Sequence, residues 1–347
     1  MMTGMQTILI TGGAGYIGSV LVPMLLSAGH KVVVIDQFYF GRETLPEHPL
    51  LHCIQQDSRS ISLQQLNDVD CIIDLAAMSN DPCGETFARL TSEVNHLARF
   101  RTARLAKEAG VKRYILPSSC SVYGYQPGIA TEESATNPLT HYARANLAAE
   151  QDILPLASST FCVTAVRLAT VFGDSPRMRL DLVVNAMTYD ALRMQEIHVS
   201  GGGTQTRPLI HVSDAAGALA TLAMAPCPAI NRQILNVGSN LMNYTINDIA
   251  EAVSYAHHVR YASRCRIIHN GPQDLRNYRV DFDRIRQILG WQPALSLETG
   301  IETLIRRFDA DELCIDGRCH TLDWYSTLQN RGELQNELSS PALTLPD

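Results

Sequence analysis

The junction between an apolar run and a glycine-rich turn near the N-terminus constrains the fold of this chain more than any other feature. Residues 7–11 are apolar or β-branched and lead directly into Gly12, Gly15 and Gly18, and a helical apolar pattern covers 16–28. A strand, a tight turn and a helix N-terminus in this order present free backbone N–H groups and a helix dipole that attract phosphate. Gly12 permits the turn, Gly15 the approach of a pyrophosphate, and Gly18 close packing of the helix.

The strand that follows strengthens this interpretation, because a glycine triplet alone is also typical of a flexible surface loop. Residues 31–35 form an apolar run that ends in Asp36. A carboxylate at this point lies where a dinucleotide presents its ribose hydroxyls. Its charge would repel a 2′-phosphate, so the sequence favours NAD over NADP, although the nearby Arg42 argues in the other direction.

Composition narrows the classes of protein and partner. A chain of 347 residues can bury a large α/β core, and its net charge of −7 argues against a nucleic-acid or anionic-membrane surface. No apolar run reaches the roughly 18 residues that a membrane span needs, and no charged or apolar leader precedes the first strand. The nine cysteines are scattered without a CxxC pair, which favours reduced thiols and no metal site. We therefore expect a cytoplasmic protein with no nucleic-acid or membrane partner.

Strand and helix patterns alternate through the first half of the chain, which predicts an α/β fold with a doubly wound parallel sheet of the Rossmann type. The expected strands are 7–11, 31–36, 51–55, 71–75, 113–117, 162–168 and 234–237. The expected helices are 16–28, 63–69, 91–109, 141–157, 215–224, 246–255, 280–289 and 297–307.

The alternation loosens after residue 173, where a smaller and mixed C-terminal lobe for the substrate is expected to begin. We expect the dinucleotide-binding domain to span 1–175 and to be rejoined by 208–240. The substrate lobe is then formed by 176–207 and 241–310. The segment 330–347 is polar and carries two prolines near its end, so it is expected to be a disordered tail.

Several short motifs fall in a characteristic order along this framework. The strand at 113–117 is followed by Ser118 and Ser119, and Tyr142 opens a later helix. Together with the glycine turn, Asp36, Asp57, Leu75-Ala76-Ala77 and Asn95, this set resembles the extended short-chain dehydrogenase/reductase family, and most closely its nucleotide-sugar epimerase and dehydratase branch. The resemblance covers about residues 7–307.

The resemblance implies an NAD-dependent epimerase or oxidoreductase that transfers a hydride at a carbon of a nucleotide-diphosphate sugar. Tyr142 would be the base, Ser119 its hydrogen-bonding partner, and the helix residue Asn95 would order the active site. The residues expected to bind the cofactor are Gly12, Gly15, Tyr16, Ile17, Gly18, Asp36, Asp57, Ser58, Leu75, Ala76, Ala77, Asn95 and Ser118.

One position departs from the family pattern Tyr-x-x-x-Lys, because Asn146 stands where the lysine is expected. Four residues after Tyr142, its side chain shares that helix face and is the third member of the expected catalytic set. A lysine would lower the tyrosine pKa from about 10 by its charge, whereas an amide can only hydrogen-bond a ribose hydroxyl. We therefore expect a weaker base with a more alkaline optimum, or an altered reaction.

A second comparison with the family disfavours 4,6-dehydration. The dehydratases carry an Asp-Glu acid/base pair directly after the catalytic Ser/Thr, and here those positions hold Cys120 and Ser121. Neither side chain is suited to eliminate water from a sugar in that way. Epimerisation, or a simple oxidation or reduction of a sugar carbon, is therefore favoured.

The second lobe carries the candidate substrate residues. The segment around Arg207 resembles the family stretch whose arginine grips the nucleotide diphosphate, and a planar guanidinium suits phosphate. Arg276 is the candidate in a second phosphate-contacting segment, and Thr170 stands where epimerases usually have Asn. Asn185, Arg177 and Arg179 are further candidates for contacts with the sugar or diphosphate.

Two other functions stay open. The absent lysine is compatible with a non-catalytic NAD-binding sensor or scaffold, and the fold is compatible with a reductase of a small, non-nucleotide carbonyl compound. The retained Ser119 and Tyr142 argue against the first, and Arg207 and Arg276 argue against the second. The helices expected at 91–109 and 141–157 resemble those that pair across a two-fold axis in the family, so a homodimer is expected.

Overall fold

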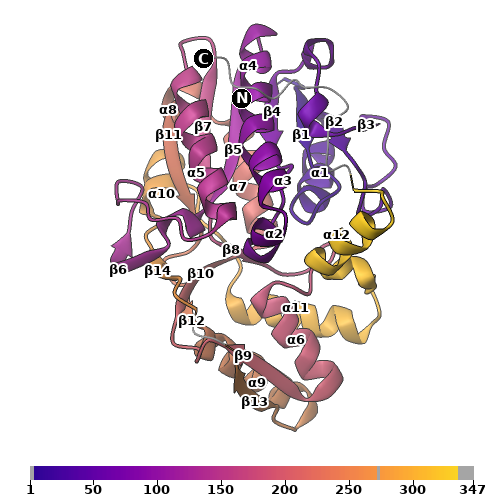
Figure 1. The fold of residues 1–347 in the computed structure, drawn as a ribbon, viewed down its shortest axis with the longest axis vertical. Helices are drawn as coiled ribbons and strands as arrows, with labels where there is room; N and C mark the ends of the chain where they lie inside the picture. The colour runs from indigo at the N-terminus through magenta and orange to yellow at the C-terminus, as the bar shows by residue number, and fades with distance from the viewer. Residues whose placement is uncertain (1–3, 272–273, 335–347) are drawn as a thin grey trace.

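The computed structural model describes residues 4–271 and 274–334. Its centre is a parallel sheet of seven strands in the order β11-β7-β5-β4-β1-β2-β3 (Figure 1). The bounds are β1 (Thr7–Thr11), β2 (Lys31–Asp36), β3 (Leu51–Gln55), β4 (Cys71–Asp74), β5 (Arg113–Ser119), β7 (Cys162–Leu168) and β11 (Gln233–Val237). Each strand lies within about two residues of its expected range, and the predicted Rossmann fold class is confirmed.

Side chains alternate between the two faces of the sheet, and each face is covered by helices. Ile8 and Ile10 belong to the core beneath α1 (Gly18–Ser27) and α7 (Val212–Met224). Leu9, between them, belongs to the core on the opposite face, beneath α4 (Arg99–Glu108) and α5 (His141–Ile153). A strand buried on both faces must be apolar at every position, which explains the unbroken apolar runs of the sequence.

Three of the expected helices differ from the prediction in their type or in where they end. The helix expected at 91–109 consists of α3 (Ala88–Ser92), a π-helical turn η3 (Glu93–Ala98) and α4. The helix expected at 63–69 is only the 3₁₀ turn η2 (Leu63–Leu66). The helix expected at 141–157 ends at Ile153, before the 3₁₀ turn η5 (Leu154–Leu156), because Pro155 has no N–H to continue the α-helical ladder.

Short elements connect these strands and helices. They are η1 (Ser58–Ser60), α2 (Asp81–Thr86), η4 (Cys120–Tyr123), β6 (Tyr125–Ala130), α8 (Cys227–Ile230), β14 (Asn277–Val280), α10 (Asp283–Leu289) and η6 (Gly317–Cys319).

A second core lies below the parallel sheet in Figure 1, around three helices: α6 (Val183–Met194), α9 (Ile246–Tyr261) and α11 (Leu297–Asp309). Strands β9 (Glu196–Ser200) and β13 (Arg266–Asn270) pair beside them. A three-stranded sheet of β12 (Asn243–Thr245), β10 (Thr206–His211) and β8 (Thr170–Phe172) joins this lobe to the large sheet. The domain limits expected from the sequence stay a prediction.

A last helix, α12 (Thr321–Asn330), was not expected from the sequence. Its Tyr325 packs edge-on against Tyr39, Phe40 and Phe87, and its Trp324 Nε1 donates to the Tyr39 carbonyl at 2.6 Å. The helix thereby closes the side of the molecule near β2. After α12, residues 331–333 are exposed and Leu334 is buried, and residues 335–347 of the expected tail lie outside the described residues.

None of the helices within 4–271 and 274–334 has both the length and the apolar character required to cross a membrane.

Candidate active site

A cavity of about 870 Å³ opens at the carboxyl ends of the parallel strands, between the sheet and the second lobe. Its wall runs from the glycine turn after β1, past the ends of β2, β4 and β5, to β10 and the segment before β14. Doubly wound sheets bind their ligands at this edge, and the volume is in the range of cofactor and substrate pockets.

The glycine turn has the geometry that a bound pyrophosphate requires. Gly12 has φ +66°, and a Cβ at this position would lie 2.8 Å from the Ala76 backbone. A Cβ on Gly18 would lie 2.5 Å from the Gly13 carbonyl oxygen. At Gly15 only the Gly12 carbonyl oxygen comes near, at 3.1 Å, so this glycine leaves its backbone open toward the cavity. Only glycine fits the two crowded positions.

Asp36, at the end of β2, is fixed by two backbone amides. Its Oδ2 accepts from the Ala14 N–H at 2.9 Å and its Oδ1 from the Phe38 N–H at 2.8 Å. Burial raises the pKa of this carboxyl, and the backbone hydrogen bonds oppose that shift. Arg42, the residue that argued for NADP, lies over the Phe38 ring, 5.8 Å from its centroid. The geometry at Asp36 therefore fits a ribose with free hydroxyls.

Asp57 and Ser58 line the same end of the cavity, and Tyr16 and Ile17 also belong to its wall. The Asp57 carboxylate is engaged by Arg59 at 2.8 Å, and Arg59 is held in turn by Glu93 at 2.6 Å. Asp57 therefore shapes this wall while it is paired with a cation.

Leu75, Ala76 and Ala77 line the cavity after β4, but Asn95 stands behind them. Its fully buried side chain accepts from the Met78 N–H at 2.8 Å and donates to the Met78 carbonyl at 3.0 Å. Asn95 thus holds the segment after β4 in place from the π-helical turn η3, which agrees with an ordering role better than with a cofactor contact.

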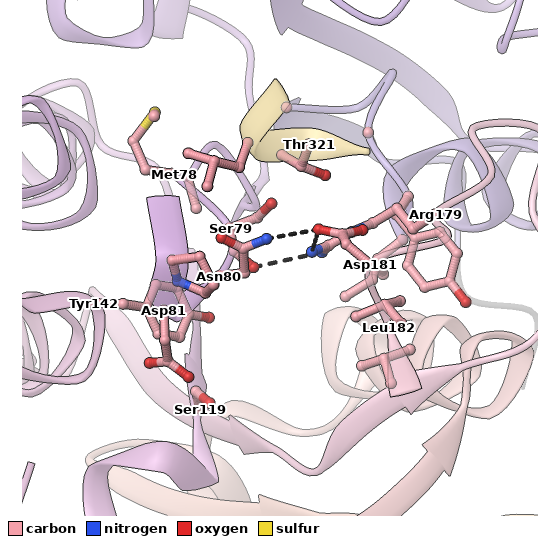
Figure 2. Close-up of a pocket in the computed structure, with 18 of the residues that line it drawn as sticks. Met78, Ser79, Asn80, Asp81, Ser119, Tyr142, Arg179, Asp181, Leu182 and Thr321 are labelled. Atoms are coloured by element: carbon pink, nitrogen blue, oxygen red, sulfur yellow. Dashed lines mark hydrogen bonds and ion pairs between the residues drawn. The ribbon is translucent and has the colours of Figure 1, made fainter. Parts of the chain in front are cut away.

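Tyr142 and Ser119 lie together on one wall, beside Asp81 (Figure 2). Tyr142 is the second residue of α5, which begins at His141 and is capped by Thr140, whose side chain accepts from the Ala143 N–H at 3.1 Å. Burial raises the pKa of the Tyr142 phenol. The charges of Arg99 and Arg179 and a hydrogen bond with Ser119 lower that pKa, whereas Asp81 raises it.

Asn146 does not reach the cavity wall, whereas Ser118 lines the cavity with its hydroxyl engaged elsewhere. Asn146 is 2% exposed, donates to the Tyr142 carbonyl at 3.0 Å, and accepts from Arg99 Nη1 at 2.9 Å. The Ser118 hydroxyl donates to Glu150 at 2.5 Å, and Glu150 pairs with the buried Arg167 at 2.7 Å. Arg99, which was not anticipated from the sequence, lines the cavity where Asn146 does not.

A network of side chains crosses the cavity opposite Tyr142, and only one of its members, Arg179, was expected from the sequence. Asn80 donates to Asp181 at 2.6 Å, and Arg179 pairs with Asp181 at 2.8 Å (Figure 2). Arg179 also donates to the Ser79 carbonyl at 3.4 Å. The order Asn80-Asp81-Pro82 is a helix-start signal that could have located α2 and this network.

Arg207 and Arg276 meet at the far end of the cavity, as expected for residues that act on one ligand group. Both pair with Asp274, at 2.6 and 2.7 Å, and Arg276 also pairs with Asp81. Arg207 Nη1 donates to the Arg276 carbonyl at 2.5 Å. These contacts hold two guanidinium groups side by side.

The remaining substrate candidates are distributed differently. Thr170 lines the cavity. Arg177 lines it under α12, where its Nη2 donates to Thr321 at 3.0 Å and burial lowers its pKa to about 10. The structure does not bring Asn185 to the cavity wall, because its fully buried amide binds the Gly173 N–H at 2.8 Å and the Tyr16 hydroxyl at 3.1 Å.

Cys120 and Ser121, which occupy the dehydratase acid/base positions, differ in exposure. Cys120 is 1% exposed, its Sγ points to the Arg167 carbonyl at 3.3 Å, and burial raises its pKa. Ser121 lines the cavity but is largely buried. Across the described parts of the chain, no group of three or more His, Cys, Asp or Glu side chains is placed to hold a metal ion.

Comparison with known proteins identifies the family and relatives to which this chain is similar. Residues 8–238 match the model of the NAD dependent epimerase/dehydratase family. The chain is 28% identical over 318 residues to UDP-glucuronic acid decarboxylase 1 of Danio rerio, a match that covers 88% of this chain and 73% of that protein.

Solved structures give a similar result. MoeE5 in complex with UDP-glucuronic acid and NAD is 29% identical, with a TM-score of 0.77 over 88% of this chain and 99% of that one. UDP-N-acetylglucosamine 4-epimerase from Methanobrevibacter ruminantium M1, in complex with UDP-N-acetylmuramic acid, has a TM-score of 0.79 and covers 89% and 100% of the two chains. Its identity is 24%, so this likeness concerns the fold alone.

Proposed function

Since the chain belongs to the NAD dependent epimerase/dehydratase family, whose cofactor is NAD, we propose that it oxidises a hydroxyl-bearing carbon of a nucleoside-diphosphate sugar. Tyr142 is the base and Ser119 its hydrogen-bond partner. The observation that carries this proposal is the single cavity that holds the glycine turn, the Tyr142–Ser119 pair and the arginine pair Arg207 and Arg276. A dinucleotide, a reacting sugar and a diphosphate each have matching groups there.

The residues at the sheet edge fit NAD. The Gly12–Gly18 turn leaves space at the backbone, and Asp36 offers a fixed carboxylate to ribose hydroxyls. When bound, NAD accepts the hydride that leaves the sugar carbon. The wall formed by Leu75, Ala76 and Ala77 then excludes water from one side of the site.

The chemistry of the chain's own residues is proton transfer. The Tyr142 phenolate takes the proton of a sugar hydroxyl, while the Ser119 hydroxyl holds the reacting oxygen in position. Burial opposes ionisation of the phenol, and the surrounding cationic groups and the hydrogen bond from Ser119 favour it.

The substrate class follows from Arg207 and Arg276. Two adjacent guanidinium groups suit the two phosphates of a nucleoside diphosphate, and they lie at the end of the cavity remote from the glycine turn. In the absence of substrate, Asp274 compensates both charges. Thr170 and Arg177 also line the cavity and are proposed to contact the substrate.

The fate of the oxidised sugar distinguishes the members of this family. The buried Cys120 supports a route without 4,6-dehydration, because its thiol faces a backbone carbonyl rather than the sugar. Epimerisation or net oxidation and reduction are therefore preferred. Decarboxylation of a hexuronate shares the same oxidation step and is the activity named for the relative from Danio rerio.

The test is a product analysis by mass spectrometry. The protein is incubated with NAD⁺ and, separately, with UDP-glucose, UDP-N-acetylglucosamine, UDP-glucuronate and dTDP-glucose in deuterated water. Formation of an isomer indicates epimerisation, loss of CO₂ indicates decarboxylation, and loss of water indicates dehydration. Formation of stoichiometric NADH indicates net oxidation. The proposal predicts turnover of at least one sugar that the Tyr142→Phe variant does not show.

Thermal shift separates the alternatives. Stabilisation by NAD⁺ and by a nucleotide sugar without turnover would favour a sensor or scaffold. Stabilisation by NAD⁺ and by no nucleotide sugar would favour a reductase of a small carbonyl compound. Absence of any stabilisation by nucleotide sugars would contradict the proposal.

We also propose the homodimer through the helices at 91–109 and 141–157. Within one chain α4 and α5 contact each other, and Ala143, Ala145 and Ala149 are already buried. Ala148, a further small residue of α5, is only half-buried and is left for the contact with a second copy. Light scattering coupled to size-exclusion chromatography tests this pairing, and a monomeric mass at micromolar concentration would contradict it.

A further inference from the structure

The family's lysine is missing at Asn146, but a cation is present beside Tyr142. Arg99 begins α4 immediately after the π-helical turn η3, and its side chain is 3% exposed and lines the cavity. Such π-helical turns often occur at functional sites. The guanidinium therefore lies on the wall that holds the base, although it comes from a different helix.

Arg99 is held rigidly by neutral acceptors. Its Nε donates to the Ala76 carbonyl at 3.2 Å, and its Nη1 donates to the Pro117 carbonyl at 3.2 Å and to Asn146 Oδ1 at 2.9 Å. Among the residues that the structure describes, Nη2 has no hydrogen-bond acceptor. Asn146 is thus an anchor for this guanidinium, since a lysine at 146 would place a second cation against it.

The charge of Arg99 differs from the other charges near Tyr142 in lacking a counter-ion. Asp81, from α2, faces the phenol but pairs with Arg276, and Arg179, from the segment before α6, pairs with Asp181. Over 4–271 and 274–334, no carboxylate forms an ion pair with Arg99. A buried and uncompensated cation is costly for stability, and it acts on its neighbours with little cancellation.

We propose that Arg99 replaces the missing lysine as the cation that stabilises the Tyr142 phenolate, with Asn146 as its positioning residue. This inference rests on the proposed role of Tyr142 as the base. It revises the expectation of a markedly alkaline optimum, because the positive charge has moved from α5 to α4 rather than disappeared. The free Nη2 is also available to a ligand in the cavity.

The test is a direct titration of the Tyr142 phenol, which requires no turnover. The full-length protein, labelled with [¹³Cζ]tyrosine and saturated with NAD⁺, is titrated by NMR, and the Tyr142→Phe variant identifies the resonance. The variants are Arg99→Gln, which keeps donors without the charge, Arg99→Met, Arg99→Lys and the double variant Arg99→Met with Asn146→Lys. The control is Arg101→Met, because Arg101 lies on the same helix and donates to the Ile61 carbonyl at 2.6 Å.

We expect Arg99→Gln and Arg99→Met to raise the Tyr142 pKa by about one unit, a tenfold loss of phenolate at a given pH. Arg99→Lys should stay near the wild type, and Asn146→Lys should lower the raised pKa of Arg99→Met. If Arg99→Met fails to fold, Arg99→Gln and Arg99→Lys still separate charge from packing.

Equal Tyr142 pKa values in wild type, Arg99→Gln and Arg101→Met would overturn the inference. This outcome is distinct from failure of the proposed function, which concerns turnover of nucleotide sugars. If the protein is inactive but the Tyr142 titration shifts as expected, Arg99 keeps its role as the compensating cation. If the protein is active but the titration does not shift, only that role of Arg99 is removed and the proposed function stands.

Discussion

The two ends of the cavity are built on different principles. At the cofactor end, Gly12, Gly15 and Gly18 act through their backbone, and all lie within one turn of the chain. At the sugar end, Tyr142, Arg179 and the arginine pair come from α5, the segment before α6, β10 and the segment before β14. The cofactor end is thus built around one local turn, whereas the sugar end is assembled from distant segments.

The difference also concerns charge. At the cofactor end the partly buried carboxylate of Asp36 is held by two amides, and that of Asp57 is paired with Arg59. At the sugar end Arg179, Arg207 and Arg276 are each paired with an aspartate, so an anionic ligand must displace protein carboxylates to bind them. We infer that NAD binds to a preformed site and that the sugar nucleotide binds by exchange of ion pairs.

The largest expected effect is a loss of turnover without a loss of cofactor binding. Tyr142→Phe removes the proton acceptor and should lower kcat by about 10²- to 10⁴-fold, because general-base catalysis supplies about that factor. NAD⁺ affinity should stay unchanged, as measured by isothermal titration calorimetry. A parallel loss of NAD⁺ binding would show that the two ends are not separable in this way.

The next prediction acts on the cofactor end. Gly12→Ala places a Cβ 2.8 Å from the Ala76 backbone at a φ of +66°, so NAD⁺ binding should weaken by about 100-fold or more. The matched control is Gly128→Ala, since a Cβ there meets nothing within 4 Å. Calorimetry with NAD⁺ measures both, and equal affinities would contradict the account of the turn.

A smaller effect is expected at the sugar end. Arg207→Met removes one member of the arginine pair and should weaken binding of UDP by about 10- to 100-fold, the value of a charged hydrogen bond. NAD⁺ affinity should not change. The control is Arg266→Met, because Arg266 pairs with Glu196 at the surface and its side chain is 71% exposed. Fluorescence or calorimetric titration with UDP that shows no difference between the variants would contradict the role of Arg207.

The smallest effect concerns acid stability of the network opposite Tyr142. Burial opposes ionisation of Asp181, but the Arg179 charge outweighs it and lowers the pKa of Asp181 to about 2. The folded state therefore holds the ionised form more tightly than the unfolded chain does. This contribution, about 2 kcal/mol, is present above pH of about 4 and is lost as the pH falls toward about 2.

Urea unfolding at several acidic pH values measures this effect. Asp181→Asn should reduce the decrease in the free energy of unfolding at acidic pH. The control Asp311→Asn, at an exposed position, should leave that decrease as in the wild type. An unchanged acid slope in Asp181→Asn would show that the Arg179 pair does not set it.

The strands and the glycine turn at the cofactor end could be predicted from the sequence because their determinants are local. An apolar strand, three glycines and Asp36 specify backbone conformations that need no distant partner. The parallel strands could be predicted for the same reason, since strands buried on both faces carry continuous apolar runs.

The sugar end could be predicted only in part, because contacts between distant segments decide which side chains face the cavity. Asn185 has the right residue type, but its amide is used by Gly173 and Tyr16. Arg99 is one of several arginines on an amphipathic helix, and only the π-helical turn and the contact with Asn146 distinguish it. Helix α12 depends on aromatic packing against Tyr39 and Phe40, which no local pattern reveals.

The central claim is that Tyr142 and bound NAD act on the same sugar carbon. A crystal structure of the Tyr142→Phe variant with NAD⁺ and the nucleotide sugar that best stabilises it tests this claim most directly. We expect the ring at position 142 on one side of a sugar carbon and the nicotinamide on the other, with the position of the missing hydroxyl about 3 Å from a sugar oxygen. A sugar bound away from that ring, or a diphosphate that does not contact Arg207 and Arg276, would contradict the account.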